Sequence, residues 1–281
     1  MTVRRETKTV EAHGARLHVV DEGADSDPPI VLVHVGIADL RSWDDLAPVL
    51  IDAGYRVVRF DLRGAGRTES DRVPFSRVDD LLAVLDACGI GRAVLVGNSM
   101  GGSTAIDAAI AAPHRVAAVV GVAAGLGGFD GGASPLEETM FEEMDTLESA
   151  DPPVPAAIAD IDIRVWVDGP GQPADRLPAA IRELVRDMDM ASYGPGHETG
   201  DVIRLDPPAV ERLAELRCPV LAVAGELDVS EVAVAARHLA EHAPNARAEV
   251  WPGVAHMIGM ERPDALAASI IDFLAPLPRW S

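Results

Sequence analysis

The sequence has 281 residues, of which 48% are apolar and 25% charged, so it can form one large domain with a sizeable core. Its formal net charge of −21 argues against binding to nucleic acid or to an anionic membrane surface, because both would repel it. The first ten residues include basic side chains but no apolar stretch, and no run of membrane-spanning length occurs. We therefore expect a cytoplasmic protein without a signal peptide.

Strand-like runs alternate with helical patterns over the first 123 residues. Residues 10–20 alternate apolar and polar side chains on both sides of His13-Gly14, which predicts a hairpin. Continuous apolar runs that predict buried strands occur at 29–34, 55–61, 92–97 and 115–123. Amphipathic spacing that predicts helices occurs at 42–54, 76–90 and 100–113. This repeated order predicts a parallel sheet with helices on both faces.

The pattern changes near Gly125. Two helical segments follow, at 135–150 and 173–190, separated by proline-rich and turn-rich pieces. The alternation of strands and helices resumes at 218–225, 231–243, 246–251 and 262–275. The sequence therefore predicts an α/β fold with a mostly parallel sheet flanked by helices. Residues 1–125 and 206–281 form its core, and residues 126–205 form a helical insertion after the sixth strand.

A serine enclosed by glycines stands between a predicted strand and a predicted helix. In GNSMG at 97–101, the glycines two positions before and after Ser99 permit a tight strand-to-helix turn that exposes the hydroxyl. The free N–H groups and the positive end of the following helix would point at the same place, where an oxyanion could form. The pattern indicates a nucleophilic serine.

Such a serine needs a base, and the base needs an orienting carboxylate. His256 follows the strand predicted at 246–251, at the carboxyl end, where open α/β sheets bind ligands. Asp228 likewise follows a predicted strand, and Glu226 is the competing carboxylate. We expect Ser99, Asp228 and His256 to form a catalytic triad. The remaining histidines lie in the hairpin, in a helix, at the opposite sheet edge, in the insertion or beside an early strand: His13, His18, His238, His242, His114, His197 and His34.

The oxyanion needs two N–H donors. One is expected to be the backbone N–H of Met100, the residue after the nucleophile. The other should come from the loop after an early strand, at 34–37, where Gly36 is preferred because glycine lets the backbone turn inward. His34 is expected to hold this loop by hydrogen bonds rather than to take part in the chemistry.

Five stretches of the chain, taken in order, resemble those of the α/β-hydrolase superfamily, in its capped, esterase-like branch of serine hydrolases. They are LVHVG at 32–36, DLRGAGRT at 61–68, GNSMGG at 97–102, GELD at 225–228 and GVAHM at 253–257. The order of Ser99, Asp228 and His256 is also the order of nucleophile, acid and base in that fold. The resemblance covers essentially the whole chain and implies that residues 126–205 form a cap over the active site.

The resemblance implies a carboxylesterase-like activity on small acyl esters through an acyl-enzyme, without a metal or an organic cofactor. The expected partner is a small ester-type molecule, with neither nucleic acid nor membrane involved, and nothing in the pattern specifies an oligomeric state. The resemblance also implies that Asp61 and Arg63 brace a turn near the pocket rather than react.

Related activities use the same triad. The stretch at 97–102 also resembles C–C bond hydrolases of aromatic-ring degradation and enol-lactonases, but those C–C hydrolases tend to have tryptophan where Met257 stands here. Haloalkane dehalogenases and epoxide hydrolases use an aspartate nucleophile, so Ser99 argues against both. A remote alternative is a non-catalytic small-molecule receptor, because fold alone does not determine function.

Apolar side chains of the insertion either line the pocket or attach the insertion to the core. The candidates are Met140, Phe141, Met144, Trp166 and Met188, and Arg164 is a candidate pocket cation. Cys88 and Cys218 are expected to be small buried residues, because no CxxC motif or Cys/His cluster accompanies them.

Overall fold

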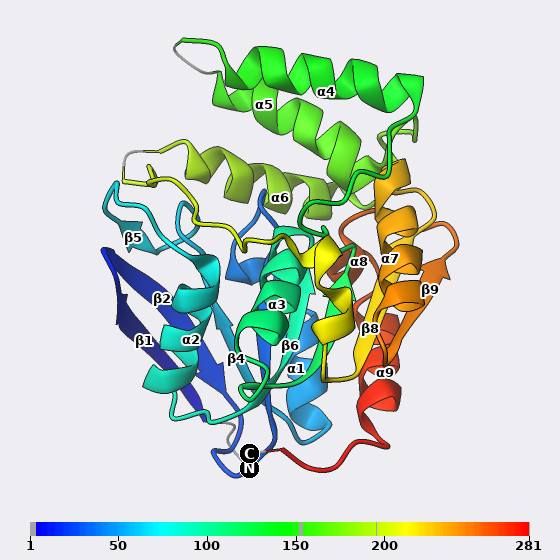
Figure 1. The fold of residues 1–281 in the computed structure, drawn as a ribbon. Coiled ribbons are helices and arrows are strands. Elements are labelled where there is room, and N and C mark those ends of the chain that lie inside the picture. Colours follow the sequence, from blue (N-terminus) through cyan, green and yellow to red (C-terminus); the bar gives the residue numbers. More distant parts are fainter. Residues whose placement is uncertain (1–3, 152–153, 195, 281) are drawn as a thin grey trace.

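The described residues of a computed structural model, 4–151, 154–194 and 196–280, form a nine-stranded sheet with helices on both faces (Figure 1). The strand order across the sheet is β1-β2-β4-β3-β6-β7-β8-β9, and β5 pairs with β2. The strands are β1 (Arg5–Ala12), β2 (Ala15–Glu22), β3 (Pro29–Val33), β4 (Arg56–Phe60), β5 (Glu69–Ser70), β6 (Ala93–Asn98), β7 (Val116–Val122), β8 (Val220–Gly225) and β9 (Ala246–Trp251).

The sheet is antiparallel at its first edge and parallel through the rest. β2 pairs antiparallel with β1, β4 and β5, whereas β3 is parallel to both β4 and β6, and β6 to β9 continue in parallel. Every residue of β3, β4, β6, β7 and β8 is buried, because helices cover both faces of these strands. The predicted fold class is confirmed. The predicted sixth strand is β7, because the two-residue strand β5 is too short to show a periodicity.

Two helical layers enclose the sheet. The helices α2 (Arg77–Ala87), α3 (Met100–Ala111) and α7 (Ser230–His242) lie on one face, and α1 (Leu46–Asp52) and α9 (Pro263–Leu274) lie on the other (Figure 1). Shorter helical turns are η1 (Leu40–Trp43), η3 (Ala209–Glu211), η4 (Leu213–Glu215) and α8 (Ile258–Glu261). The helices leave the carboxyl ends of β3, β6, β8 and β9 facing the segment that follows β7.

That segment contributes a group of helices above the carboxyl edge of the sheet (Figure 1). They are α4 (Pro135–Glu148), α5 (Pro155–Asp162), the π-helix η2 (Ile163–Asp168) and α6 (Ala179–Ser192). The sequence predicted only the helices corresponding to α4 and α6. Pro155 stands at the first turn of α5, where proline is tolerated, and Ile158, Ile161 and Val165 are buried at helical spacing. Those two signals indicate the missed helix.

Polar and apolar contacts attach these helices to the core. Glu137 Oε1 in α4 accepts hydrogen bonds from the backbone and the hydroxyl of Ser230, at the start of α7. Arg176 forms an ion pair with Glu261, whose carboxylate also accepts a hydrogen bond from the backbone N–H of Ala255. An apolar cluster joins residues of the helices to residues of the core: Val35, Ala38, Ile163, Val167, Val185, Met188, Met257 and Met260. These contacts hold the helices above the strand ends.

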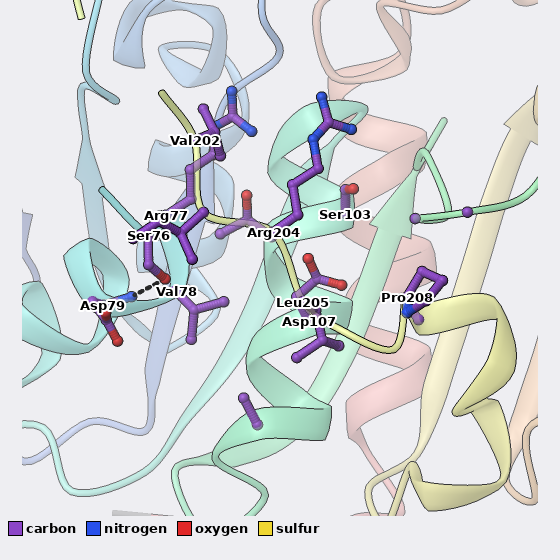
Figure 2. Close-up of a pocket in the computed structure, with 16 residues that line it drawn as sticks. Ser76, Arg77, Val78, Asp79, Ser103, Asp107, Val202, Arg204, Leu205 and Pro208 are labelled. Carbon is purple, nitrogen blue, oxygen red and sulfur yellow. Dashed lines mark hydrogen bonds between the residues drawn. The ribbon is translucent and has the colours of Figure 1, made fainter. Parts of the chain in front are cut away.

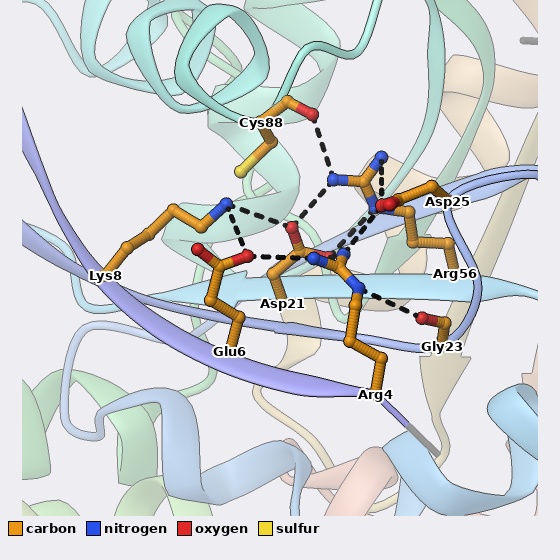
Figure 3. Close-up of polar contacts among 8 residues, drawn as sticks. All are labelled: Arg4, Glu6, Lys8, Asp21, Gly23, Asp25, Arg56 and Cys88. Atoms are coloured by element: carbon orange, nitrogen blue, oxygen red, sulfur yellow. Dashed lines mark hydrogen bonds and ion pairs between the residues drawn. The ribbon is translucent and has the colours of Figure 1, made fainter. Parts of the chain in front are cut away.

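At the other end of the sheet, a network of charges holds β1, β2 and β4 to the end of α2 (Figure 3). Asp21, fully buried, accepts from Arg56 Nε and Nη2 at 2.9 and 2.7 Å, and Arg56 Nη2 also donates to the carbonyl of Cys88. Lys8 and Arg4 contact the same carboxylate. Burial alone would raise the pKa of Asp21, but the hydrogen bonds and charges of these cations hold it below its usual value.

Cys88 and Cys218 are both buried and free, as predicted, and burial raises the pKa of the Cys218 thiol to about 11. Within the described ranges, none of the helices is long and apolar enough to cross a membrane.

Candidate active site

Ser99 occupies a tight turn between β6 and α3. Its backbone has φ 53° and ψ −114°, a conformation that non-glycine residues rarely adopt and that stores strain. A Cβ atom on Gly97 would lie 2.2 Å from the carbonyl oxygen of Gly101, and one on Gly101 would lie 2.2 Å from that of Val33. Only glycine fits at both positions, so the two glycines let α3 begin directly against the ends of β6 and β3.

His256 and Asp228 lie together at the carboxyl ends of β9 and β8. The Nδ1 atom of His256 is 2.9 and 2.8 Å from Asp228 Oδ1 and Oδ2, and both side chains are buried. Asp228 Oδ1 also accepts a hydrogen bond from the backbone N–H of Val229. The competing carboxylate, Glu226, instead accepts from the backbone N–H of Gly253. Of the two carboxylates, Asp228 is therefore the one that can orient the imidazole.

The structure brings the candidate base, His256, close to the serine turn. The side chain of Asn98, which precedes Ser99, donates from Nδ2 to the carbonyl of His256 at 3.3 Å and to that of Val122 at 3.2 Å. No hydrogen bond joins the Ser99 hydroxyl to the His256 ring within the described part of the chain. Such bonds are often long before a substrate binds and tighten in the complex.

The side chain of Met100, the first expected oxyanion donor, reaches Gly36, the second. A Cβ atom on the exposed Gly36 would be 3.8 Å from the side-chain Cε of Met100. Neither backbone N–H takes part in a hydrogen bond among residues 4–151, 154–194 and 196–280, so both can donate to a ligand. Met100 begins α3, where the helix dipole also favours negative charge.

His34, Asp61 and Arg63 hold the loops around this edge. His34 Nδ1 donates to the carbonyl of Val35 at 2.7 Å, and Nε2 accepts from the backbone N–H of Leu62 at 2.9 Å. Complete burial lowers the pKa of His34 and keeps the ring neutral, which this pair of bonds requires. Asp61 accepts the backbone N–H of Arg67 in its own turn and that of Leu40 in η1, and Arg63 forms a bidentate pair with Asp80.

Comparison with known proteins agrees with this geometry. The sequence matches the alpha/beta hydrolase fold family over residues 28–263. The chain belongs to the alpha/beta hydrolase family. It is 27% identical, over 92% of this chain and 91% of the other, to a 2-hydroxy-6-oxononadienedioate/2-hydroxy-6-oxononatrienedioate hydrolase of Burkholderia vietnamiensis. It is 28% identical, over 88% and 91%, to the rhodomycin D methylesterase DauP of a Streptomyces species.

The fold of this alpha/beta hydrolase is also that of solved esterases. The crystal structure of the carboxylesterase CesB from Bacillus subtilis superimposes with a TM-score of 0.74 at 20% identity, covering 96% of this chain and 92% of that one. The predicted superfamily is confirmed, and with it the prediction of a hydrolase.

One of the residues proposed to line the pocket of this hydrolase contacts the candidate base. The rings of Trp166 and His256 have centroids 4.7 Å apart at 48°, and the ring of Phe141 stacks on that of Trp166 with centroids 6.2 Å apart. Met140 and Met188 are buried in apolar clusters, so they attach the helices to the core. The sixth candidate, Arg164, is exposed and pairs with Glu143.

Trp166 is anchored by a pair of carboxyl groups inside the helical segment. Its Nε1 donates to Asp162 Oδ1 at 3.1 Å, and Asp162 is hydrogen-bonded to Asp189 of α6. Burial, and then the neighbouring carboxylate, raise the pKa of Asp189 to about 8, and burial raises that of Asp162 to about 6. At neutral pH the pair therefore keeps one proton, held mainly by Asp189, which donates to Asp162.

We expect Asp189→Asn to stabilise the protein in mildly alkaline solution. Because the folded-state pKa of Asp189 is raised above its unfolded value near 4, its contribution to stability is present at about pH 4 and is lost as the pH rises to about 8. Asparagine at position 189 keeps a hydrogen-bond donor for Asp162 and removes the ionisable carboxyl group. The Tm of Asp189→Asn should exceed that of the wild type by about 3 °C or more at pH 8.5 and match it at pH 4.5.

The control is Asp187→Asn, which neutralises an exposed carboxylate on the same helix. Its Tm difference from the wild type should stay the same between pH 4.5 and 8.5. If both variants show the same dependence on pH, Asp189 does not hold a proton in the folded protein.

Proposed function

We propose that this alpha/beta hydrolase cleaves small acyl esters with Ser99 as nucleophile, His256 as base and Asp228 as the orienting acid. The observation that carries the proposal is the position of the His256 ring. Its Nδ1–H donates to the buried Asp228, and its backbone is held by the residue before Ser99. This tautomer leaves Nε2 free of a proton and able to accept the one from the serine hydroxyl.

The proposed reaction has two halves. Ser99 Oγ attacks the ester carbonyl carbon while His256 takes the hydroxyl proton, and the N–H groups of Met100 and Gly36 stabilise the oxyanion. The intermediate collapses, the C–O bond to the alcohol breaks, and His256 returns the proton to the leaving alcohol. A water molecule then attacks the acyl carbonyl while His256 takes its proton. The bond to Ser99 Oγ breaks, the acid leaves, and His256 returns the proton to Oγ. Residues 126–205 would act as the cap, with Trp166 against the base.

One relative supports an ester substrate, and another favours an alternative substrate class. The methylesterase of Streptomyces supports hydrolysis of an ester, because it matches most of this chain. The Burkholderia hydrolase, which matches as much, acts on an oxo-dienedioate and favours the second candidate, a hydrolase of C–C bonds or enol-lactones that uses the same triad. Both candidates require the same covalent nucleophile.

A covalent probe and a substrate panel test the proposal in turn. A fluorophosphonate should label the purified protein at one residue, Ser99, and labelling should be absent in Ser99→Ala. Among p-nitrophenyl acetate, an enol-lactone and a vinylogous 1,5-diketone, the ester should have the highest kcat/KM. Labelling at another residue would contradict the triad, and faster turnover of the diketone or the lactone would select the second candidate.

A further inference from the structure

A cavity of about 420 Å³ runs along α3, from Ser103, one helical turn after Ser99, to Ala111 near the end of the helix. The start of α2, one face of α3, the loop after β7 and the segment 202–209 enclose it (Figure 2). Its volume falls within the range of small-molecule sites, roughly 300–1,000 Å³. Val78 and Leu205 contribute apolar walls, and Arg77, Arg204 and Asp107 contribute charge. The cavity therefore has the size and the mixed lining of a ligand site.

Two arginines line this cavity, and Asp107 is the carboxylate that shares it with them. Within the described part of the chain, the side chains of Arg77 and Arg204 make no hydrogen bond and no ion pair. Burial, and then the charge of Arg204, lower the pKa of Arg77 below its usual value, so the two cations repel each other. Asp80, a nearby carboxylate, is already bound by Arg63 at 2.7 Å in a bidentate pair.

The local fold places the segments that carry the two arginines side by side. Phe75, just before α2, exchanges backbone hydrogen bonds with the segment returning from the helices: its N–H donates to Asp201 at 3.0 Å, and Ile203 donates to its carbonyl at 2.7 Å. This bridge positions Arg204 beside the first turn of α2, where Arg77 stands. Both side chains extend in the same direction, toward the end of α3 that follows Ser99 (Figure 2).

Asp107 adds an acceptor to the same cavity. Its Oδ1 atom is buried and finds no hydrogen-bond partner among the described residues. Burial raises the pKa of Asp107 to about 6, and the charges of Arg77, Arg204 and Arg212 act in the opposite direction. A buried acceptor left without a donor costs roughly 1–3 kcal/mol, which a ligand carrying a donor would recover.

We propose that this cavity binds a small carboxylate that carries a hydroxyl group. The carboxylate lies between Arg77 and Arg204, and the hydroxyl donates to Asp107. Both cations gain a directly bonded anion, which neither has among the described residues, since arginine binds carboxylates in a bidentate manner. This site goes beyond the proposed esterase activity, and its binding can be measured without any turnover.

Calorimetric titration of the full-length protein tests the site. The probes are 3-hydroxybutyrate, butyrate and 1,3-butanediol, which differ by one group at a time. We expect 3-hydroxybutyrate to bind about threefold to tenfold more tightly than butyrate, and the diol not to bind. Arg77→Gln or Arg204→Gln should lower the affinity for both 3-hydroxybutyrate and butyrate about tenfold or more. Asp107→Ala should remove the preference for the hydroxy acid while butyrate binds at least as well as before.

The matched control is Arg237→Gln, which removes the same charge from an exposed position on α7. Its affinity for 3-hydroxybutyrate should equal that of the wild type. Absence of saturable binding to the wild-type protein would overturn the proposal. Equal weakening by Arg204→Gln and Arg237→Gln would also overturn it, because binding would then depend on overall charge. Arg204 is exposed, so its replacement leaves the core intact.

Two esters identify the source of the carboxylate. If it is part of the substrate, Arg204→Gln should raise KM for monomethyl succinate about tenfold and leave KM for methyl butyrate unchanged. If it is a separate molecule, both KM values should be unchanged, while calorimetry still shows the lower affinity of Arg204→Gln for 3-hydroxybutyrate. Either result supports the cavity as a carboxylate site. Failure of ester turnover would contradict the proposed function alone, because calorimetry is independent of it.

Discussion

Replacement of Ser99 by alanine is expected to lower kcat/KM for p-nitrophenyl acetate by about 10⁴-fold or more. The proposed reaction proceeds through a bond to Ser99 Oγ, and neither His256 nor the oxyanion donors can replace that bond. A small residual rate should remain, because the N–H groups at Met100 and Gly36 still stabilise an oxyanion formed by direct attack of water. Steady-state kinetics with purified protein measures the loss.

The backbone at Ser99 allows a second measurement on the same residue. Glycine adopts φ 53°, ψ −114° with less strain than serine or alanine, so Ser99→Gly should be as inactive as Ser99→Ala but more stable by about 1 kcal/mol. Ser70→Ala is the control, because Ser70 is a partly exposed residue in β5 whose hydroxyl bonds only its neighbour's carbonyl. Turnover by Ser99→Ala within tenfold of the control would refute the assignment of the nucleophile.

The central strands and the pairing of Asp228 with His256 were predictable because they depend on local patterns. The runs in β3, β6 and β8 are apolar along their whole length, which indicates burial on both faces without knowledge of their neighbours. Residues that follow parallel strands must meet at one sheet edge, so the sequence order alone placed Asp228 and His256 together. Because β8 and β9 are neighbouring strands, the short loops after them bring the two side chains to 2.8 Å.

Other features depend on contacts between segments that are distant in the sequence. The stripe at Ile158, Ile161 and Val165 begins in the short helix α5 and continues into η2, between proline-rich pieces where turn signals outweigh a weak periodicity. Trp166 meets His256, and Asp162 meets Asp189, only because η2, α5 and α6 pack against one another and against the loop after β9. The carboxylate cavity is still less predictable, because the bridge at Phe75, far from Arg204 in sequence, brings its two arginines together.

Substitution of Gly101 by alanine is expected to reduce the free energy of unfolding by about 3 kcal/mol or more and to lower the Tm by at least about 6 °C. Gly101 lies in α3, where helix propensity alone would favour alanine by about 1 kcal/mol, so local preference predicts the opposite sign. The loss arises because the new methyl group would lie 2.2 Å from the carbonyl oxygen of Val33 and 2.7 Å from that of His34.

Those two carbonyls end β3 and begin the loop that carries Gly36, so the same clash should displace the proposed oxyanion donor and reduce kcat. Gly125→Ala is the matched control, because its methyl group would lie 3.8 Å from Ser103 Oγ, an ordinary contact. Thermal unfolding of both variants, followed by circular dichroism, provides the comparison. If Gly101→Ala is as stable as Gly125→Ala, α3 can move away from β3 at little cost. The close approach at Gly101 would then not be what holds the Gly36 loop beside the serine.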